Sequence, residues 1–360
     1  MTAPPTGPEP IAGLLARARR DVERGWLPAC QLAVARHGEL LAFETFGAAT
    51  NNTRFCIFSA TKPLVAAAVW VLVGEGALEP ERAVAHYVPE FDRPALRAVT
   101  VDQVLVHTAG LPHAPMLPDE GADPARRRRR MATWQLEWAP CTRFEYHALS
   151  AHWVLAELIE RLSGTGYCDF LAERVTTPLG LPRLLGPAVG PPPVVAPLTW
   201  VGQAAGTEGP GALSFPIDDP ADIAAGVPGA GGVATAAEVA RFYQALLEDA
   251  AGVWDPAVLA DATGHIRCTL PDPLLGAPVN RSRGLVIAGD DGLHTMRYGA
   301  FAEGNSPRAF GHAGAHVQVA WADPATGISF CYLTNGLDHD TLREGVRGLK
   351  LSNLAAALAG

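Results

Sequence analysis

Lysine is almost absent from this chain. Of its 28 basic residues only two are lysines, Lys62 and Lys350, and arginine occupies the other basic positions. An ammonium group can lose its proton when it is buried, whereas a guanidinium group effectively cannot. A lysine retained in such an arginine-rich chain is therefore a candidate for proton-transfer chemistry. Lys62 lies three residues after Ser59.

The sequence also lacks any C-x-x-C pair. Scattered cysteines without such spacing are typical of free, mostly buried thiols and argue against a disulfide framework or a zinc site. We therefore expect no metal and no other cofactor. The six cysteines are Cys30, Cys56, Cys141, Cys168, Cys268 and Cys331.

The sequence also lacks a membrane-targeting segment and a positive net charge, and both absences limit the possible partners of this protein. The N-terminal ten residues carry no basic segment followed by an apolar one, and the apolar run Leu64–Gly74 is too short to span a bilayer. A net charge of −9 argues against a general nucleic-acid binder. We expect a cytoplasmic protein with neither nucleic acid nor membrane as partner, and the oligomeric state stays open. The run Arg126–Arg130 is a nucleic-acid patch or a solvated face, and the acidic whole favours the solvated face.

The segment after Lys62 predicts a buried helix. Residues 64–73 are apolar almost all round, and Pro63 is tolerated only near a helix start. Ser59 would then lie at the N-terminus of a core helix, one turn from Lys62, where burial lowers a lysine pKa and free amides can hold an oxyanion. The simpler alternative is a serine that caps the helix and a lysine on its solvated first turn.

Periodicity along the chain predicts an α+β fold of the α/β sandwich type. Strand patterns cluster at both ends and helical patterns fill the middle, so we expect one antiparallel sheet built from both termini, flanked by helices, with a mostly helical insertion. Predicted helices cover 11–24, 59–74, 101–106, 148–162, 235–248 and 338–358, and predicted strands cover 31–34, 40–46, 284–287, 317–322 and 328–334.

The same pattern suggests a division of the chain. Residues 1–75 and 284–360 would form the sheet domain and residues 76–283 the inserted helical domain, with the active site between them. Residues 185–232 are rich in proline and glycine and have little periodicity. A loop region of that length in a compact protein is more often functional than not.

Two further motifs accompany the serine–lysine pair. Tyr146 precedes a predicted helix, and His312-Ala313-Gly314 precedes a predicted strand. Together with Ser59-x-x-Lys62 they resemble, in order, the three motifs of the serine β-lactamase and D,D-peptidase superfamily. The resemblance covers about residues 30 to 336 and is greatest to the class C-like branch, which includes the family VIII carboxylesterases. Smaller matches are residues 106–112, 229–236 and 322–327.

The resemblance implies roles for these residues. Ser59 would be the nucleophile that forms an acyl-enzyme, and Lys62 would hold and relay its proton. Tyr146 would be the general base, its phenol pKa lowered by the nearby ammonium. The backbone amides of Ser59 and Ala315 would form the oxyanion hole. The expected substrate-binding residues are His312, Gly314, His316 and His147.

Each of these side chains also has a simpler interpretation. Tyr146 could be an aromatic residue at a helix start, and His312 a histidine whose hydrogen bonds are satisfied at a strand end. His147 could pack rather than react. His316 and Cys141 occupy positions where relatives often have glycine, and His316 could narrow the acyl pocket.

Departures from the family pattern indicate the substrate. Many members have Tyr-x-Asn where this chain has Tyr146-His147-Ala148, and lactamases have Lys-Thr-Gly where it has His312-Ala313-Gly314. An amide and a permanent cation are thus missing, and histidine is mostly neutral near pH 7. We expect a serine esterase or acyl-transferring enzyme acting on a small neutral ester. The alternatives are a β-lactamase or D,D-peptidase and, from another class, a non-catalytic binding protein that retains the fold.

Overall fold

The computed structural model describes residues 8–187, 190–202 and 217–359 of the chain. Its helices are α1 (Pro8–Glu23), α2 (Lys62–Gly74), α3 (Val101–Leu105), α4 (Pro118–Ala122), α5 (Pro124–Met131), α6 (Ser150–Ser163), α7 (Tyr167–Leu171), α8 (Pro220–Ala225), α9 (Ala236–Leu247), α10 (Pro256–Gly264) and α11 (Thr341–Ala356). Its strands are β1 (Ala29–Arg36), β2 (Glu39–Gly47), β3 (Phe55–Cys56), β4 (Thr199–Val201), β5 (Val233–Ala234), β6 (Val286–Ile287), β7 (Phe310–Gly311), β8 (Val319–Asp323), β9 (Ile328–Thr334) and β10 (Gly336–Asp338).

Both ends of the chain build one sheet. Six strands lie in the order β2-β1-β9-β8-β7-β6, and every neighbouring pair is antiparallel. β1 and β2 form a hairpin whose turn, His37-Gly38, has positive φ angles at both residues, as tight hairpin turns require. The predicted fold class, with an antiparallel sheet made from N- and C-terminal segments, is confirmed.

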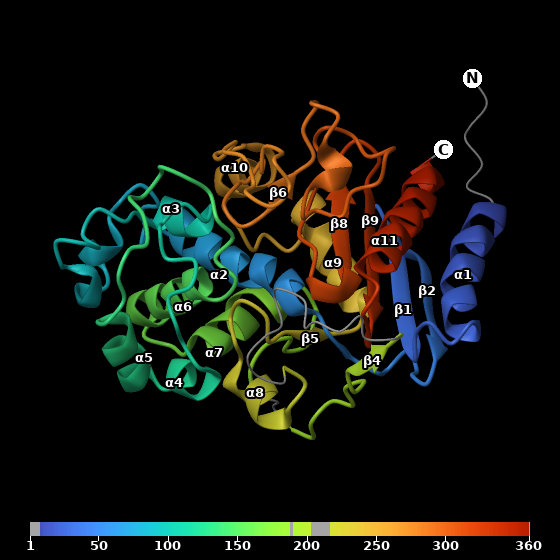
Figure 1. Ribbon diagram of the computed structural model, residues 1–360, viewed down its shortest axis with the longest axis horizontal. Helices are drawn as coiled ribbons and strands as arrows, with labels where there is room; N and C mark the ends of the chain where they lie inside the picture. The colour runs from blue at the N-terminus through green and yellow to red at the C-terminus, as the bar shows by residue number, and fades with distance from the viewer. Residues whose placement is uncertain (1–7, 188–189, 203–216, 360) are drawn as a thin grey trace.

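Helices cover the sheet on its two faces. α9 packs against β1, β8 and β9, whereas α1 and α11 pack against each other and against β2 and β9 (Figure 1). α9 lies inside residues 76–283, so part of the predicted inserted segment contributes directly to the sheet layers. The division into two domains at residues 75 and 284 stays a prediction.

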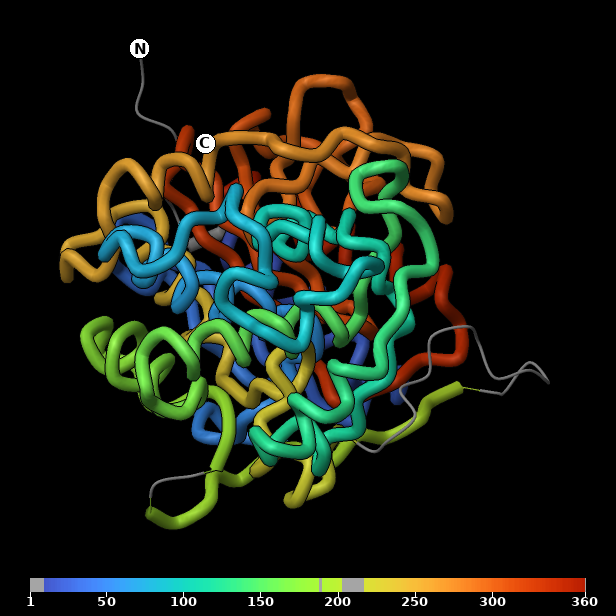
Figure 2. The backbone as a smooth tube through the Cα atoms, turned by 90° about the vertical axis from the view of Figure 1, so that its left-hand side faces the viewer, coloured from blue at the N-terminus to red at the C-terminus, as the bar shows by residue number. Residues whose placement is uncertain are grey.

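α2 is the centre of the helical half of the molecule. Its residues from Lys62 to Leu72 are all buried, because the helix is apolar on every side and has other elements around it. It packs against α6, α7 and α10 (Figure 2). The predicted burial of this helix is confirmed, and the lysine at its first position is therefore carried into the interior.

Three predicted boundaries differ from the structure for local reasons. β8 begins two residues late, at Val319, because His316 and Val317 both have positive φ and form a turn. α11 begins at Thr341 because Gly336–Asp338 pairs with β4, and the Asp340 side chain then caps the helix. α6 begins at Ser150 and ends, as predicted, before Gly164, which has the left-handed conformation of a helix cap.

The prediction of a long irregular region at 185–232 can be judged only in part. β4 and α8 lie within it, and residues 188–189 and 203–216 fall outside the described residues. Its functional role remains a prediction.

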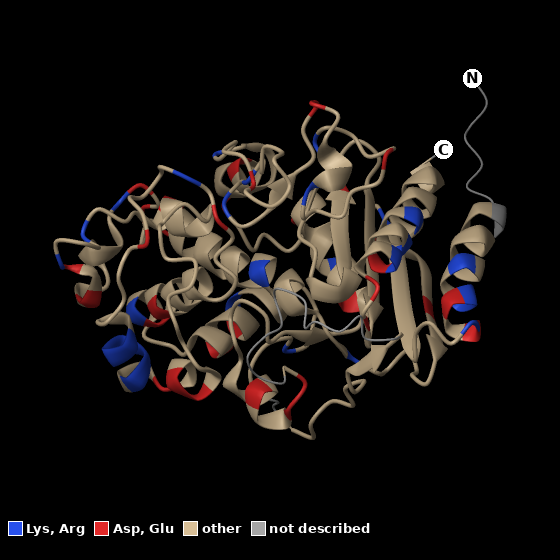
Figure 3. Cartoon of the chain, in the orientation of Figure 1, with Lys and Arg blue, Asp and Glu red and all other residues tan. Residues whose placement is uncertain are grey.

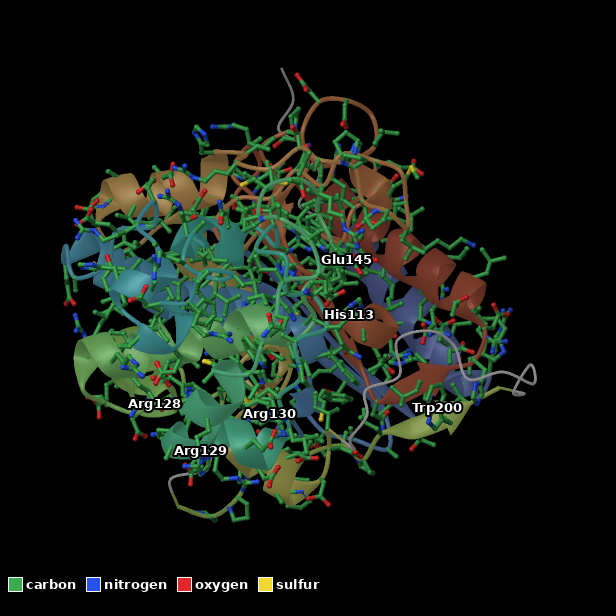
Figure 4. All side chains as sticks on the ribbon, turned by 60° about the vertical axis from the view of Figure 1, so that its left-hand side comes forward. His113, Arg128, Arg129, Arg130, Glu145 and Trp200 are labelled. Atoms are coloured by element: carbon green, nitrogen blue, oxygen red, sulfur yellow. The ribbon has the colours of Figure 1, made fainter. Side chains whose placement is uncertain are left out.

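The arginine run is largely the solvated face that the sequence suggested, and Arg127 is the exception. It forms α5, visible as a concentration of basic residues in Figure 3, and Arg128, Arg129 and Arg130 are labelled in Figure 4. Arg127 is fully buried and ion-paired with Glu157 and Glu160 of α6, while Arg128 shares Glu157. The charge pattern could not reveal this because the acidic partners lie some thirty residues away in the sequence.

Within the described ranges no helix is both long enough and apolar enough to cross a membrane. All six cysteines are free thiols; four are buried, Cys168 is half-buried and Cys141 is exposed. The expectation of free, mostly buried thiols is confirmed.

Candidate active site

Ser59 lies on a tight turn at the start of α2. It is the second residue of a 3₁₀ turn, Phe58–Thr61, and Phe58 before it has φ of 46°, a strained value for an aromatic residue. The Thr61 hydroxyl holds the turn by donating to the Phe58 carbonyl at 2.6 Å and accepting from the Gly232 amide at 2.9 Å. Ser59 itself is half-buried, so its hydroxyl stays open to a substrate.

Lys62 is completely buried beneath Ser59 and has three polar neighbours. Its Nζ lies 3.2 Å from Ser59 Oγ, 2.8 Å from the Ala148 carbonyl and 2.7 Å from the Gly229 carbonyl. Carbonyl oxygens only accept hydrogen bonds, so two N–H bonds must point at Ala148 and Gly229. The third position on Nζ then faces Ser59 Oγ, and in the neutral amine that position is the lone pair.

The electrostatic setting favours the amine form of Lys62. Burial lowers its pKa well below the usual lysine value, and the positive charge of Arg281 lowers it further. Gly229 is required for this contact, since a Cβ there would lie 2.9 Å from the Ala148 oxygen and 3.4 Å from Nζ. The sequence placed Lys62 beside Ser59 correctly. The two carbonyls could not be foreseen, because they lie 86 and 167 residues away.

Tyr146 lies beside the pair, but not in the state that the resemblance implied. Lys62 Nζ is 4.9 Å from the centre of the phenol ring, and Tyr298 stacks on that ring at 5.7 Å. Burial raises the pKa of Tyr146 to about 12, although Arg281 and the Ser59 hydroxyl act in the opposite direction. The expected lowering is therefore wrong. The residue is half-buried and its hydroxyl is buried; the Ser59 hydroxyl lies close enough to affect its pKa, but no described residue forms a hydrogen bond of normal geometry with it.

His147 holds the loop that carries Tyr146. Its Nε2 accepts from the Leu111 amide at 2.9 Å, and its Nδ1 donates to the Glu145 carbonyl at 2.6 Å. The side chain is fully buried, and burial lowers its pKa to about 4. Because both nitrogens are occupied, His147 has none to offer a substrate, and the packing alternative describes it better than the substrate-binding one.

On the outer side of the same loop, Glu145 lies beside His113, with 3.6 Å between Glu145 Oε1 and His113 Nε2 (Figure 4). The loop is thus tied from both sides, by His147 inside and by Glu145 outside. This restraint fixes where Tyr146 points.

Two further imidazoles surround Tyr146 and Lys62. His107 lies 4.9 Å from the Tyr146 ring, and His152 of α6 stacks on His107 at 6.1 Å. Burial lowers the pKa of both well below the usual histidine value, so both are neutral. Nowhere in the described ranges do three His, Cys, Asp or Glu side chains lie where they could hold a metal ion together. The sequence analysis assigned neither histidine a role, although His107 lay in a matched motif.

His312 is buried opposite Tyr146 with one nitrogen free. Its Nδ1 donates to the Ala313 carbonyl at 2.8 Å, and its Nε2 has no partner among the described residues. The ring centre is 6.0 Å from that of Tyr146. Burial lowers the pKa of His312 well below the usual value, and Arg281 and Lys62 add to that effect. The imidazole is therefore neutral across the range in which an unperturbed histidine would titrate.

Gly314 and Ala315 bring the end of β7 close to the Ser59 turn. A Cβ on Gly314 would lie 2.3 Å from the Ile57 carbonyl, so this approach requires glycine. The Gly314 amide donates to the Gln318 carbonyl at 2.8 Å, and Ala315 is exposed. The role of Ala315 in an oxyanion hole stays a prediction.

His316 is turned away from the buried cluster. It has φ of 55°, which agrees with the expectation that relatives carry glycine at this turn. Its Nδ1 is 3.0 Å from Glu344 Oε1, and its ring packs edge-on against Phe58 and the half-exposed Trp200. Trp200 is labelled in Figure 4. Its effect on an acyl pocket remains a prediction.

Arg281 is the main residue that the sequence analysis missed. It is 1% exposed, its guanidinium carbon lies 5.2 Å from the Tyr146 ring centre and 5.8 Å from that of Phe144, and none of its three nitrogens has a partner among the described residues. The expected loss of a cation concerned position 312, which holds a neutral histidine, and Arg281 supplies a permanent cation at another place, beside Tyr146. Arginines are frequent here, and no feature of residues 278–284 distinguishes this one.

A cavity of about 970 Å³ lies elsewhere, between β2, α8 and α9. Phe43, Arg54 and Glu238 line it, and Ser59 does not. We do not assign the reaction to that cavity.

Comparison with known proteins places these residues in a family context. The family model described as Beta-lactamase matches residues 15–352. Among curated proteins the chain is 27% identical over 312 residues to Esterase/beta-lactamase LipL of Mycobacterium tuberculosis, covering 78% of this chain and 69% of the relative. It is 33% identical over 178 residues to Esterase EstB of Burkholderia gladioli, covering 41% and 44%.

Solved structures agree with the fold. A penicillin-binding protein homolog from Caulobacter crescentus superposes with a TM-score of 0.76 at 26% identity and covers 99% of both chains. A family VIII carboxylesterase superposes with a TM-score of 0.77 at 24% identity, covering 97% of this chain and 98% of that one.

Proposed function

This chain belongs to the Beta-lactamase family, and from that premise we propose that it is a serine hydrolase that cleaves small neutral esters through an acyl-enzyme on Ser59. The observation that carries this proposal is the contact between Lys62 and Ser59. A neutral amine whose two N–H bonds go to Ala148 and Gly229 directs its lone pair at the serine hydroxyl, 3.2 Å away.

The geometry supports a direct proton transfer in the first step. Ser59 Oγ attacks the ester carbonyl carbon, and its proton passes to Lys62 Nζ, which becomes an ammonium. The tetrahedral oxyanion collapses, the bond to the alcohol oxygen breaks, and the alcohol leaves with a proton. Water or another acceptor then takes the acyl group from Ser59 by the same steps in reverse order.

Tyr146 takes a different part in this scheme from a general base. With a pKa of about 12 its phenol keeps its proton at neutral pH, and its hydroxyl has no partner among the described residues. It is suited to transfer its proton to the leaving alcohol oxygen and to take the proton held by Lys62 in its place, so that Lys62 returns to the amine. The backbone amides of Ser59 and Ala315 complete the proposal as the oxyanion hole.

Three features support a neutral ester as substrate. His312 is neutral, Ala148 lacks the amide that many relatives have at that position, and the cavity beside Arg281 is only about 10 Å³. That cavity has room for about one water molecule and none for a substrate carboxylate. Two relatives that carry the name esterase agree with this choice.

The second candidate is hydrolysis of a lactam or a peptide. It is favoured by the name Esterase/beta-lactamase of one relative and by a match to a D-aminopeptidase of Brucella canis, 28% identical over 172 residues. A non-catalytic binding protein is the third. Its weakness is Lys62, because a binding site gains nothing from a buried amine aimed at a serine.

One set of assays separates the three candidates. The protein is incubated with a fluorophosphonate probe, a short p-nitrophenyl ester and a chromogenic cephalosporin, with Ser59→Ala as the matched control. We expect probe labelling and ester hydrolysis in the wild type only, with kcat/KM for the ester orders of magnitude above that for the cephalosporin. Comparable values would favour the lactamase, and the absence of labelling would favour the binding protein. A cytoplasmic location and a small-molecule partner remain predictions.

A further inference from the structure

Arg281 is a buried charge that makes no ion pair with any described residue, although the buried carboxylate of Asp272 lines the same small cavity and acts on it. Its Nε, Nη1 and Nη2 atoms have no hydrogen-bond partner within the described part of the chain, and the residue is 1% exposed. A buried charge left unpaired costs free energy, so structural arginines are normally paired. The unfavourable free energy of burying Arg281 suggests that this residue is retained for a function rather than for stability.

The backbone on both sides fixes where this side chain points. The Arg281 amide donates to the Cys268 carbonyl at 3.0 Å, and the Cys268 amide donates back to the Arg281 carbonyl at 3.1 Å. The guanidinium is then held over the rings of Phe144 and Tyr146, which attract a cation through their negative faces. Lys62 Nζ lies 4.9 Å from the centre of the same Tyr146 ring, so Arg281 and Lys62 are separated by no more than one aromatic side chain.

Every other titratable group that faces Lys62 is neutral. Burial lowers the pKa of His107, His152 and His312 well below the usual histidine value, and it raises the pKa of Tyr146 to about 12. Within the described ranges no carboxylate acts on the Lys62 pKa. The guanidinium stays protonated at any working pH, so Arg281 is the fixed charge that acts on the Lys62 pKa. The carboxylate of Asp272 acts on Arg281 and Tyr298 and is not among the groups that shift Lys62.

We propose that Arg281 is a positioning residue for catalysis, whose permanent positive charge holds Lys62 as the neutral amine that accepts the Ser59 proton. This proposal rests on the proposed role of Lys62 as the proton acceptor. An ammonium at Lys62 would place two like charges in one apolar interior, and the amine avoids this. The amine still keeps its contacts to the Ala148 and Gly229 carbonyls.

Recognition of a substrate anion is the competing explanation of the same residue. The cavity beside Arg281, which Asp272 and Tyr298 also line, measures about 10 Å³. A carboxylate would not fit there, whereas about one water molecule would. The site therefore favours an electrostatic effect on Lys62 over a direct contact with substrate.

The scarcity of lysine makes a direct measurement feasible. Protein labelled with ¹³C at the lysine Cε gives two signals, Lys62 and Lys350, and Lys350→Arg assigns them. Titration of the full-length protein should show Lys62 losing its proton at a much lower pH than the Lys350 reference. If the two lysines titrate alike in the wild type, the proposal is wrong, and this result needs no Arg281 variant.

The matched variants are Arg281→Gln and Arg283→Gln. Arg283 lies two residues away but is paired with Asp102, Asp261 and Glu81, so it controls for loss of an arginine from this segment. Arg281→Gln should move the Lys62 titration to higher pH, and Arg283→Gln should leave it in place. An unchanged Lys62 titration in Arg281→Gln would overturn the proposal.

Kinetics supply a readout that a merely structural role would not give. Because the base must be an amine, kcat/KM should fall at low pH as Lys62 becomes protonated. This low-pH side of the profile, the acid limb, should move to higher pH in Arg281→Gln, because loss of the positive charge raises the Lys62 pKa. Below the limb, the activity of the variant relative to wild type should fall about tenfold for each pH unit by which the limb moves, and well above the limb the two proteins should converge. A uniform loss at all pH values, or a loss confined to carboxylate-bearing esters, would contradict the proposal. The lysine titration does not depend on ester turnover, so it remains decisive even if the proposed hydrolysis fails.

Discussion

Arg127 and Arg281 are both almost completely buried, yet their surroundings are opposite. Arg127 donates to Glu157 at 2.9 Å and to the Gly121 carbonyl at 2.7 Å, and it pairs with Glu160 as well. The guanidinium of Arg281 lies over two aromatic rings and forms no ion pair with a described residue, although Asp272 lines the same cavity. One region of the molecule uses a buried charge to hold α5 on α6, and the other leaves it uncompensated beside the candidate nucleophile.

The difference shows how to separate structural charge from functional charge. A paired buried charge is strongly destabilising to break but has little effect beyond its partners. An unpaired one lowers stability and shifts the pKa of every titratable group nearby, and perturbed groups of this kind cluster at functional sites. Catalytic effects should therefore concentrate around Arg281, and stability effects around Arg127.

The largest expected effect is that of Ser59→Ala on activity. Removing the nucleophile eliminates the covalent route, so kcat for a p-nitrophenyl ester should fall by a factor of about 10⁴ or more. The thermal midpoint should change little, because Ser59 is half-buried and its hydroxyl forms one side-chain hydrogen bond among the described residues, with Lys62. Steady-state kinetics and calorimetry on the same sample check both parts. If Ser59→Ala still hydrolysed the ester, Ser59 would not be the nucleophile, and the region around Arg281 could not be called catalytic.

Next comes the replacement of Lys62. Lys62→Arg and Lys62→Met should both reduce kcat by about 10² to 10⁴, since Arg keeps a charge but cannot accept a proton. Lys62→Arg keeps a positive charge and Lys62→Met does not, so a comparison of the two variants separates the effect of charge from that of proton transfer. An active Arg variant would mean that charge alone is needed at this position.

Breaking the paired region should unfold the protein rather than inactivate it. Arg127→Met leaves Glu157 and Glu160 without their buried partner and should cost about 3–5 kcal/mol of unfolding free energy. Activity per folded molecule should stay at the wild-type level. Urea denaturation with active-site titration measures both. The exposed Arg129 on the same helix provides the control, since Arg129→Met should change neither quantity.

The unpaired arginine should behave in the opposite way. Arg281→Met removes a buried charge that has no partner among the described residues, so the unfolding free energy should stay constant or rise, by about 1–3 kcal/mol. The variant would at the same time lose the charge that favours the amine form of Lys62. A destabilisation as large as that of Arg127→Met would show that Arg281 is paired after all, through a group that the contacts above do not include.

The smallest expected effect concerns a turn outside both clusters. Cys141 is exposed with φ of 61°, a conformation that favours glycine, and its amide donates to the Thr108 carbonyl at 2.9 Å. Cys141→Gly should raise the unfolding free energy by about 0.5–1 kcal/mol, with kcat unchanged. Denaturant midpoints of the two proteins decide it, and a lower midpoint in the variant would contradict strain at this turn.

The sequence by itself determined the features that depend on near neighbours along the chain. The apolar pattern of α2 placed Lys62 in the interior one turn from Ser59, and strand patterns at both ends predicted the sheet. Period and composition act within a few residues, so they can be read without a structure. The Tyr146 and His312 motifs were identified differently, by their resemblance to family motifs that occur in the same order along the chain.

Tertiary structure alone decided the chemical state of the site. The carbonyls of Ala148 and Gly229 orient Lys62, and Arg281 adds a charge that none of the motifs reveals. The pKa of Tyr146 rises instead of falling, because burial outweighs the nearby charges. These outcomes depend on which distant segments meet and how completely they exclude water. Local periodicity encodes neither the contacts between distant segments nor the exclusion of water. The motifs therefore identified the residues of the site, whereas packing determined their protonation states.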